Sequence, residues 1–207
     1  MNFGLNEDQQ MLRDTFARFL DDHACIARLR AAQQTGGFDV ALWSELAGLG
    51  TFAMRVPAES GGLGLGTLDV AIVAEELGRT LASGPVLEAI LAARLLAQSN
   101  SDGDLLAAVL DGSKVATIAL GDVAERSRQW LPGGAHADVV IARRGGEIVA
   151  YSVPAADRQA EACLASDGLG EVDFAALTGT SIASGGQALD GFAAAVEEWK
   201  LLTAAML

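Results

Sequence analysis

The sequence predicts an α+β fold, with an N-terminal helical bundle domain, an antiparallel β-barrel-like middle domain and the start of a C-terminal helix. Three observations carry this prediction. Apolar residues recur at helical spacing up to about residue 112, β-branched runs bounded by Gly or Pro follow from Ser113, and helical spacing returns at Gly191. The expected domains are residues 1–112, 113–190 and 191–207.

Composition and charge exclude several classes of protein. The 207 residues are 51% hydrophobic and carry a net charge of −13, from 27 acidic and 14 basic residues. Such a chain can bury a sizeable core, and its acidic balance argues against a nucleic-acid partner. The N-terminus lacks the pattern of a signal peptide, and no stretch reaches the roughly 20 apolar residues of a membrane span. We therefore expect a cytoplasmic protein without a membrane span.

The first two helices are predicted from their capping residues. Asn6 is followed three positions later by Gln9, the spacing of a capping box, and an apolar stripe comes directly after. Asp39 is placed to cap a second, short helix that ends at Gly48 or Gly50. Both helices turn one apolar face toward the expected core.

Three more helices complete the predicted N-terminal domain. The third opens at Thr67 or Leu68, and its Glu75 and Arg79 are spaced for an i,i+4 surface pair. Pro85 suits the first position of the fourth helix, because a helix needs no N–H donor there. The fifth is expected over residues 101–112.

The middle of the chain reads as strands. The stretches "KVATIAL", "ADVVIARRGGEIVAYSV" and "GTSIAS" are rich in β-branched residues, and Arg143 to Gly146 is typical of a hairpin turn. The C-terminal stretch returns to a helical stripe with too much apolar surface to stand alone, so it requires a packing partner. Its apolar members are Phe192, Ala195, Val196, Trp199, Leu202 and Met206.

One segment raises a specific question. In "WLPGGAHAD", Trp130 directly precedes a Pro-Gly-Gly sequence that breaks both helices and strands. The indole could be a core anchor beside a turn or the wall of a ligand pocket. The residues alone leave both interpretations open.

Three segments resemble the acyl-CoA dehydrogenase family. They are "LNEDQQMLRDTFARFL", "VPAESGGLGLGTLDVAIVAEELGR" and "AHADVVIARR", in the family's order. The resemblance implies a flavoprotein of fatty acid or lipid metabolism that introduces an α,β double bond into an acyl-CoA thioester. A glutamate would remove the α proton while a hydride passes to FAD. Because the family carries that base in a C-terminal helical domain, residues 191–207 resemble the first helix of a truncated one, and no catalytic residue is assigned within residues 1–207.

The resemblance also implies where the cofactor would bind. The strip "GDVAERSR" and the segment "WLPGGAHAD" are similar to two FAD-lining segments of the family, and both depart from the family's pattern. The implied cofactor-binding residues are Leu120, Gly121, Asp122, Ser127, Trp130 and Pro132.

The departures concern hydrogen bonding. Gly121 and Pro132 stand where the family has threonine, and proline offers neither a hydroxyl nor an N–H. Gly133 replaces an asparagine. About twenty residues that the family inserts between Arg128 and Trp130, enough for a hairpin, are missing. FAD binding by this chain alone is therefore doubtful.

Other candidate sites are weak. Cys25 and Cys163 form no ligand-spaced pair and are expected to be buried free thiols. His136 and Asp138 lack a third ligand, so we expect a loop histidine and no metal site. The glycines of "GGLGLG" follow no strand and are expected to form a structural turn, not a phosphate loop. Arg126, Arg128 and Arg144 could meet CoA phosphates, but they more simply read as surface charges.

Three functions remain open. The chain could be part of a working acyl-CoA dehydrogenase whose base lies outside residues 1–207, or a non-catalytic partner subunit of a heteromeric one with degenerate flavin contacts. It could also be a relative of an acyl-CoA oxidase or a flavin monooxygenase, since fold does not fix the reaction. The expected partners are an acyl-CoA substrate, a further acyl-CoA dehydrogenase chain in a homo- or hetero-oligomer, and an electron-transfer flavoprotein or similar acceptor.

Overall fold

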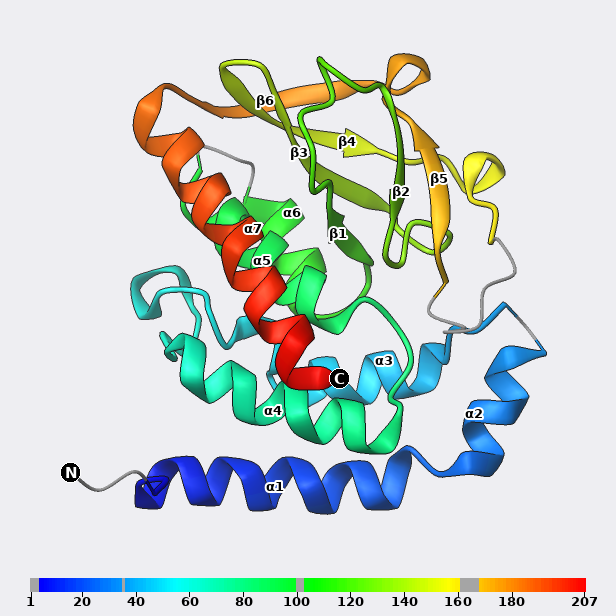
Figure 1. Cartoon of the computed structure of the whole chain (residues 1–207), viewed down its shortest axis with the longest axis vertical. Coiled ribbons are helices and arrows are strands. Elements are labelled where there is room, and N and C mark those ends of the chain that lie inside the picture. Colours follow the sequence, from blue (N-terminus) through cyan, green and yellow to red (C-terminus); the bar gives the residue numbers. More distant parts are fainter. Residues whose placement is uncertain (1–3, 35, 100–102, 161–167) are drawn as a thin grey trace.

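The helices and strands that the sequence predicts occur in the expected order along the chain, and further elements lie among them. The computed structural model describes residues 4–34, 36–99, 103–160 and 168–207. Its helices are α1 (Glu7–His23), α2 (Ile26–Gln33), α3 (Val40–Gly48), α4 (Thr67–Thr80), α5 (Val86–Ala97), α6 (Gly103–Leu110) and α7 (Gly186–Met206). Its strands are β1 (Ala116–Ile118), β2 (Arg128–Leu131), β3 (Val139–Arg144), β4 (Glu147–Ser152), β5 (Gly170–Asp173) and β6 (Gly179–Ser184). Figure 1 shows α1, α3 and α4 at one end of the molecule and the strands at the other.

The predicted capping residues begin their helices. The Asn6 side chain accepts from the Gln9 N–H at 2.8 Å, and the Asn6 N–H donates to Gln9 Oε1 at 3.2 Å, so the capping box of α1 is confirmed. Asp39 Oδ1 likewise accepts from the Leu42 N–H at 2.9 Å and caps α3. Helix α5 begins at Val86, one residue after Pro85. The expected start of the fifth helix, Ser101, lies outside the described residues.

The short helix α2 has no counterpart in the prediction. Its sequence, "IARLRAAQ", has only a weak apolar stripe, and Ala32 is its one buried residue. A helix that buries so little leaves no strong periodic signal in the sequence.

The strands form an open sheet. Its order is β1-β3-β4-β6, and β2 pairs separately with β5. The predicted α+β fold is confirmed, and three of the four strand pairs are antiparallel as expected, whereas β1 and β3 run parallel and the sheet does not close. The chain leaves the main sheet after β1, adds β2 to the second sheet, and returns to β3 in the original direction, which makes the pair parallel. The hairpin is confirmed, with Gly145 and Gly146 between β3 and β4.

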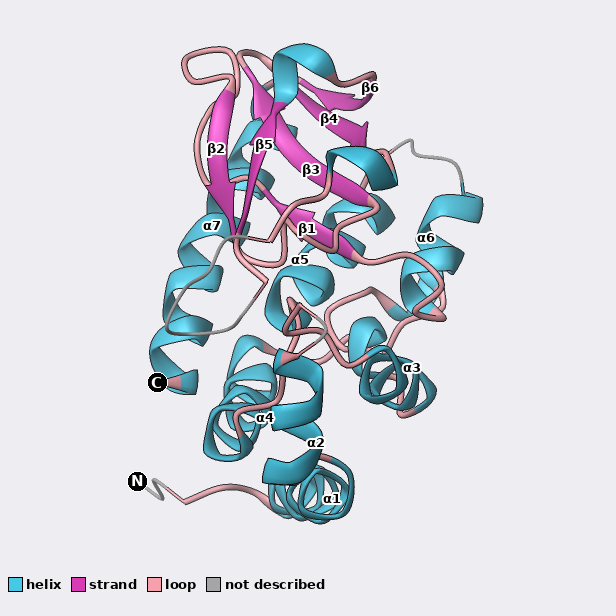
Figure 2. Cartoon of the chain, turned by 90° about the vertical axis from the view of Figure 1, so that its right-hand side faces the viewer, coloured by secondary structure: helices cyan, strands magenta, loops and turns pink. Residues whose placement is uncertain are grey.

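Helix α5 lies between the two halves of the molecule. Every residue from Val86 to Leu96 is buried, because α6, α7 and β1 all pack around this helix. Figure 2 shows the strands on one side of α5 and the helices α1 to α4 on the other. A second apolar cluster fills the space between the two sheets, with Leu131, Val140 and Phe174 among its members.

The C-terminal helix finds its packing partners within the chain. It begins at Gly186, five positions before the expected Gly191, and packs on α4 and α5 (Figure 1). Phe192, Ala195 and Leu202 of the predicted stripe are buried. At its far end the helix approaches Gly78 of α4 so closely that a Cβ there would lie 1.7 Å from the Met206 carbonyl oxygen.

A charged cluster also joins α7 to the helical domain. Glu198 points into the core from the buried face of α7, where its carboxylate pairs with Arg55 at 2.8 Å and with Arg94 of α5. Thr67 Oγ1, at the start of α4, donates to the same carboxylate at 3.0 Å. The next residue, Trp199, donates its indole N–H to the buried Glu88 of α5 at 2.5 Å. These contacts fix how α7 lies on α4 and α5.

Two further expectations can be compared with the structure. No helix in the described part of the chain is long and apolar enough to cross a membrane. Cys25 is exposed at the start of α2, so its expected burial is wrong, because the weakly amphipathic α2 does not cover it. Cys163 lies outside the described residues. The division into three domains stays a prediction.

Candidate functional site

The turn after β1 and the strand β2 enclose a groove of about 790 Å³. Its lining residues are Leu120, Gly121, Asp122, Glu125, Arg126, Arg128, Gln129, Trp130 and Glu171. Four of the six implied cofactor residues therefore meet there. Their role in binding a cofactor stays a prediction.

Trp130 forms part of the groove wall. It lies on β2 opposite Glu171 of β5 and is 50% exposed, whereas the next residue, Leu131, is fully buried. Because successive side chains of a strand point to opposite faces, only one of the two can enter the core. The core-anchor interpretation of Trp130 is therefore wrong, and its pocket-wall interpretation is retained.

The backbone of Gly121 is hydrogen-bonded within the chain. Its N–H donates to Gln129 Oε1 at 3.2 Å, and its carbonyl accepts from Gln129 Nε2 at 3.2 Å. The same Nε2 also donates to the Arg126 carbonyl at 3.0 Å. The Gln129 carboxamide thus bridges the two sides of the groove.

The Asp122 carboxylate holds together two of the turns beside the groove. Its Oδ1 accepts from the backbone N–H groups of Ala124 and Gly145, each at 2.9 Å, and its Oδ2 pairs with Arg143 at 3.2 Å. These contacts tie the turn after β1 to the β3–β4 hairpin. Its lone pairs are accordingly engaged with protein donors.

Ser127 and Pro132 lie outside this groove. Ser127 is exposed, and its carbonyl accepts from the Phe174 N–H at 2.8 Å. Pro132 lines a separate slot of about 120 Å³ between the start of α5 and the end of α7, and its carbonyl accepts from Thr117 Oγ1 at 2.8 Å. The six implied residues therefore do not form one site.

The turn after Pro132 is pressed against α5. Gly133 has a φ of +66°, and a Cβ there would lie 2.4 Å from Cβ and Cγ of Pro85. The asparagine that the family resemblance implies at this position would not fit this packing. The glycine thus lets the turn approach the helix that separates the two halves.

The charges in the groove are mixed. Three carboxylates, from Asp122, Glu125 and Glu171, lie among its lining residues with two arginines. Arg128 pairs with Asp173 at 3.0 Å, which leaves Arg126 as the arginine in the groove without a salt bridge among the described residues. This balance does not favour a pyrophosphate.

Three of the implied cofactor residues have their hydrogen-bonding groups engaged within the chain or lack a donor. The pyrimidine edge of an isoalloxazine presents carbonyl oxygens and one N–H, so it needs both protein donors and an acceptor. Gln129 already engages both groups of Gly121, the Asp122 carboxylate is occupied, and Pro132 has no donor. Gly121, Asp122 and Pro132 therefore offer little to that edge, and the polar groups left for a ligand in the groove include the charged side chains of Arg126, Glu125 and Glu171.

Arg144 lies away from the groove. It pairs with Glu147 at 2.7 Å, and its guanidinium lies 6.0 Å from the centre of the Tyr151 ring. The hydrogen bond to Glu147 raises the pKa of Arg144 above its usual value. The structure thus separates Arg144 from Arg126 and Arg128, with which it was grouped as a possible contact to CoA.

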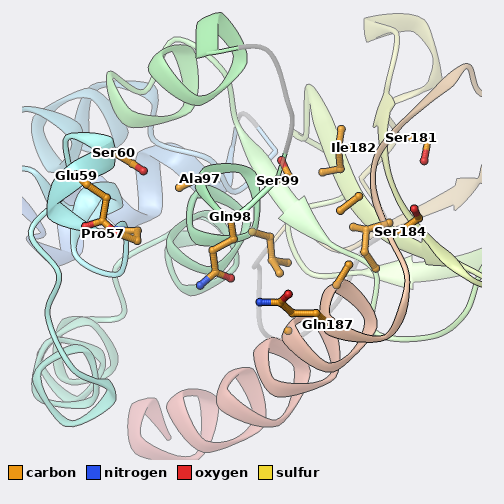
Figure 3. A pocket seen from close by; sticks show the side chains of 15 residues that line it. Pro57, Glu59, Ser60, Ala97, Gln98, Ser99, Ser181, Ile182, Ser184 and Gln187 are labelled. Atoms are coloured by element: carbon orange, nitrogen blue, oxygen red, sulfur yellow. The ribbon is translucent and has the colours of Figure 1, made fainter.

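A larger groove of about 930 Å³ lies between α5, the turn over residues 57–60, β6 and the start of α7. Figure 3 shows the Gln98 and Gln187 side chains extending into it from the two helices. Serine hydroxyls supply most of its other polar groups, and among the described residues that line it Glu59 alone is charged. An anionic groove lining does not suit the phosphates of CoA.

His136 makes a structural contact between the two halves. Its Nε2 lies 3.0 Å from the Gly36 carbonyl, and its ring stacks on Phe38 with centroids 4.8 Å apart. Burial lowers the pKa of His136, opposed by the Gly36 contact and reinforced by nearby Arg158. Asp138 instead pairs with Arg158 at 2.7 Å. Across the described residues, no cluster of three or more His, Cys, Asp or Glu could hold a metal ion.

The two other candidates have structural roles. In "GGLGLG", a Cβ at Gly62 would lie 2.1 Å from the Val56 carbonyl, which supports a tight structural turn. Arg79 pairs with Glu76 at 2.6 Å, not with Glu75. The predicted i,i+4 pair is therefore wrong, because Glu76 lies on the inner side of α4, where the arginine can reach it.

Two functional features were missed at the level of sequence. Gln129 lies between the two segments that resemble the family's FAD-lining segments, and no sequence pattern indicated that its side chain would contact Gly121. Glu198 interrupts an apolar stripe, a pattern that does indicate a buried partner, although its partners lie more than 100 positions away in the chain.

Comparison with known proteins identifies the family. The model of the acyl-CoA dehydrogenase N-terminal domain matches residues 6–102. The chain is 35% identical to acyl-CoA dehydrogenase IpdE2 of Mycobacterium tuberculosis over 149 residues, which cover 70% of this chain and 45% of the relative. It is 30% identical to benzylmalonyl-CoA dehydrogenase of Aromatoleum aromaticum, with 71% and 46% coverage. The chain thus spans about half the length of these curated relatives.

Solved structures agree with this assignment. The Tcur3481-Tcur3483 steroid ACAD superposes with a TM-score of 0.77 at 26% identity, covering 97% of this chain and 62% of that one. The ChsE4-ChsE5 complex from Mycobacterium tuberculosis gives a TM-score of 0.70 at 25% identity, with 96% and 61% coverage. The chain belongs to the acyl-CoA dehydrogenase family.

Proposed function

We propose that this chain is a partner subunit of a heteromeric acyl-CoA dehydrogenase. The assembly would introduce an α,β double bond into an acyl-CoA thioester, by proton abstraction and hydride transfer to FAD. In this proposal both the base and the reactive flavin lie outside residues 1–207. The chain contributes a folded helical and β framework against which a flavin-holding chain assembles.

The packing of the Pro132–Gly133 turn carries this proposal. The turn lies against Pro85 without room for a Cβ, and the slot beside it measures only about 120 Å³. Ligand pockets for drug-sized molecules usually measure at least about 300 Å³. This slot has no room for a flavin beside Pro132, where the family resemblance implies a cofactor contact, which supports a role that does not include the chemical step.

Two further observations agree with a heteromer. Two solved relatives at 25% identity or more, Tcur3481-Tcur3483 and the ChsE4-ChsE5 complex, are each named as a pair of proteins. The net charge of −13 also makes general attraction of CoA phosphates unfavourable. An acyl-CoA and an electron-transfer flavoprotein or similar acceptor would then be partners of the assembly.

Co-expression tests the proposal. The purified chain alone should be colourless, whereas its complex with a flavin-binding acyl-CoA dehydrogenase chain should be yellow and reduce a dye acceptor with acyl-CoA. The matched control is the flavin-binding chain expressed alone. A flavin spectrum from this chain by itself, at one flavin per chain, would overturn the proposal.

A further inference from the structure

We infer that the Gln129 side chain is an internal ligand, which occupies the hydrogen-bonding edge of the Trp130 groove in place of a planar ring with an imide edge. The inference rests on the proposed function for its biological meaning, because a chain that leaves flavin to its partner can close its own groove. Its physical basis is independent of any reaction.

The geometry supplies the first step. The Gln129 carboxamide accepts from the Gly121 N–H and donates to the Gly121 carbonyl, both at 3.2 Å, so one side chain engages both backbone groups of one residue. Its second amide hydrogen is directed to the Arg126 carbonyl at 3.0 Å. Both donor hydrogens of this side chain are therefore used within the groove.

The chemistry identifies the class of molecule that the side chain replaces. A carboxamide presents an acceptor and a donor side by side, and the edge of an imide or lactam ring presents the same pair. Trp130 adds a half-exposed aromatic face in the same groove, and flat rings stack favourably on such a face. An uncharged planar ring suits the groove better than a phosphate-bearing ligand, because Asp122, Glu125 and Glu171 line it.

Sterics link the two residues. A Cβ built on Gly121 would lie 3.2 Å from Gln129 Oε1, closer than most real Cβ contacts, and 3.5 Å from its Nε2, an ordinary van der Waals distance. A side chain at position 121 would therefore move the carboxamide by a few tenths of an ångström and lengthen its 3.2 Å hydrogen bonds to Gly121. Glycine at this position does more than remove a hydroxyl, since it gives Gln129 the space to approach the backbone.

Replacing Gln129 in the full chain tests the inference. In Gln129→Ala, the Gly121 amide should exchange with solvent roughly tenfold faster, because its acceptor is gone. Gln187→Ala removes a carboxamide from the separate groove of Figure 3 and should leave the Gly121 amide unchanged. Nuclear magnetic resonance of the labelled chain measures both rates. Equal Gly121 exchange in the wild type and Gln129→Ala would overturn the inference.

Riboflavin is the binding probe, because it carries the imide edge without phosphates. Its affinity for Gln129→Ala, measured by fluorescence quenching, should exceed that for the wild type by about tenfold, equivalent to about 1.4 kcal/mol. Equal affinity for the two proteins, or no binding by either, would overturn the inference that Gln129 excludes such a ring.

A glycine variant and its matched control test whether the space at Gly121 allows Gln129 to approach the backbone. Gly121→Ala should displace Gln129 and shift its side-chain amide resonances toward those of a free glutamine, whereas Gly146→Ala, which meets nothing within 4 Å, should not. Unchanged Gln129 resonances in Gly121→Ala would contradict the inference. These readouts need no partner chain, so they can fail while the co-expressed complex is active, and the reverse also holds.

Discussion

Two polar networks join distant segments of this chain, and they differ in their exposure to water. The Glu198 cluster, formed by Glu198, Arg55, Arg94 and Thr67, is largely buried between α4, α5 and α7. The contacts of Gln129 lie in an open groove. The difference shows that similar polar groups have different roles. In the buried cluster, which water does not reach, the contacts contribute to the stability of the fold. In the open groove, which water enters, the contacts affect which ligand can bind.

The Glu198 cluster is costly to disturb because its charges are unequal. Two guanidinium groups share one carboxylate, whose side chain is only 7% exposed. Removing the carboxylate would leave two positive charges in a region with little water. Removing a buried partner is far more destabilising than the net contribution of the pair itself.

The largest effect is expected for Glu198→Leu. The variant should lose about 3–5 kcal/mol of unfolding free energy, measured by urea denaturation, because two arginines lose their shared partner. Glu197→Ala is the matched control on the same helix. Its pair with Lys200 is exposed, so its loss should be at most about 0.5 kcal/mol. Similar losses in the two variants would break the contrast between buried and exposed networks.

A compensated variant sharpens the same contrast. Replacing the whole ionic set, in Arg55→Met, Arg94→Met and Glu198→Leu together, should bring the stability back to within about 1 kcal/mol of the wild type or above it. The apolar side chains avoid the cost of removing three charges from water. A triple variant as unstable as Glu198→Leu alone would show that the charges themselves are required.

Gly78 tests whether shape as well as charge holds α7. Gly78→Ala should cost about 1–3 kcal/mol, because its Cβ would collide with the Met206 carbonyl. Gly191→Ala, also within a helix, meets only Gln98 Oε1 at 4.0 Å and should be neutral or stabilising by up to about 1 kcal/mol. Thermal unfolding of both variants provides the comparison. An unaffected Gly78→Ala would show that α7 can shift on α4 without loss.

His136 is an intermediate case, and pH tests it. Burial lowers the pKa of His136 below its ordinary value of 6.5 in the folded chain, so the unfolded chain takes up a proton first as the pH falls. The contribution of His136 is therefore complete above pH 6.5, declines as the pH falls through that value, and stops changing below the folded pKa. Unfolding curves of His136→Asn should lack this decline. If the unfolding free energies of the wild type and His136→Asn changed in parallel between pH 8 and 5, His136 would not be the source of the decline.

The smallest effect is expected at the rim of the groove. Arg128→Ala removes an exposed pair with Asp173 and should change the unfolding free energy by less than about 0.5 kcal/mol. Denaturation at low and high salt measures it. A loss above 1 kcal/mol would mean that the groove is as rigid as the Glu198 cluster.

Local signals predicted the helices well. The Asn6 and Asp39 caps act within three residues, and the apolar stripes of α4 and α5 reflect burial on one continuous core. The parallel pairing of β1 with β3 was missed because it depends on the path of the intervening chain. The strands β2 and β5 were missed for a similar reason, since each consists of four residues whose partner lies far along the sequence.

Four of the six implied cofactor residues line one groove, and their role in binding a cofactor stays a prediction. The family resemblance brought Gly121 and Trp130 together, and the structure gives them one groove. It also grouped Pro132 with them, although that residue lies in the turn after β2, which ends at Leu131, and lines the separate slot beside α5. The closure by Gln129 could not be foreseen, because it requires the turn over residues 121–126 to fold back onto β2.

The three tryptophans give this chain its own optical reporters. Trp43 is buried between Phe38 and Phe52, Trp199 is half-buried beside Glu88, and Trp130 is half-exposed in the groove. A shielded indole emits at shorter wavelengths than one in contact with water. Three variants that each keep one tryptophan would therefore report on different regions. The emission maximum of Trp43 would follow the helical core, that of Trp199 the packing of α7, and that of Trp130 the occupancy of the groove.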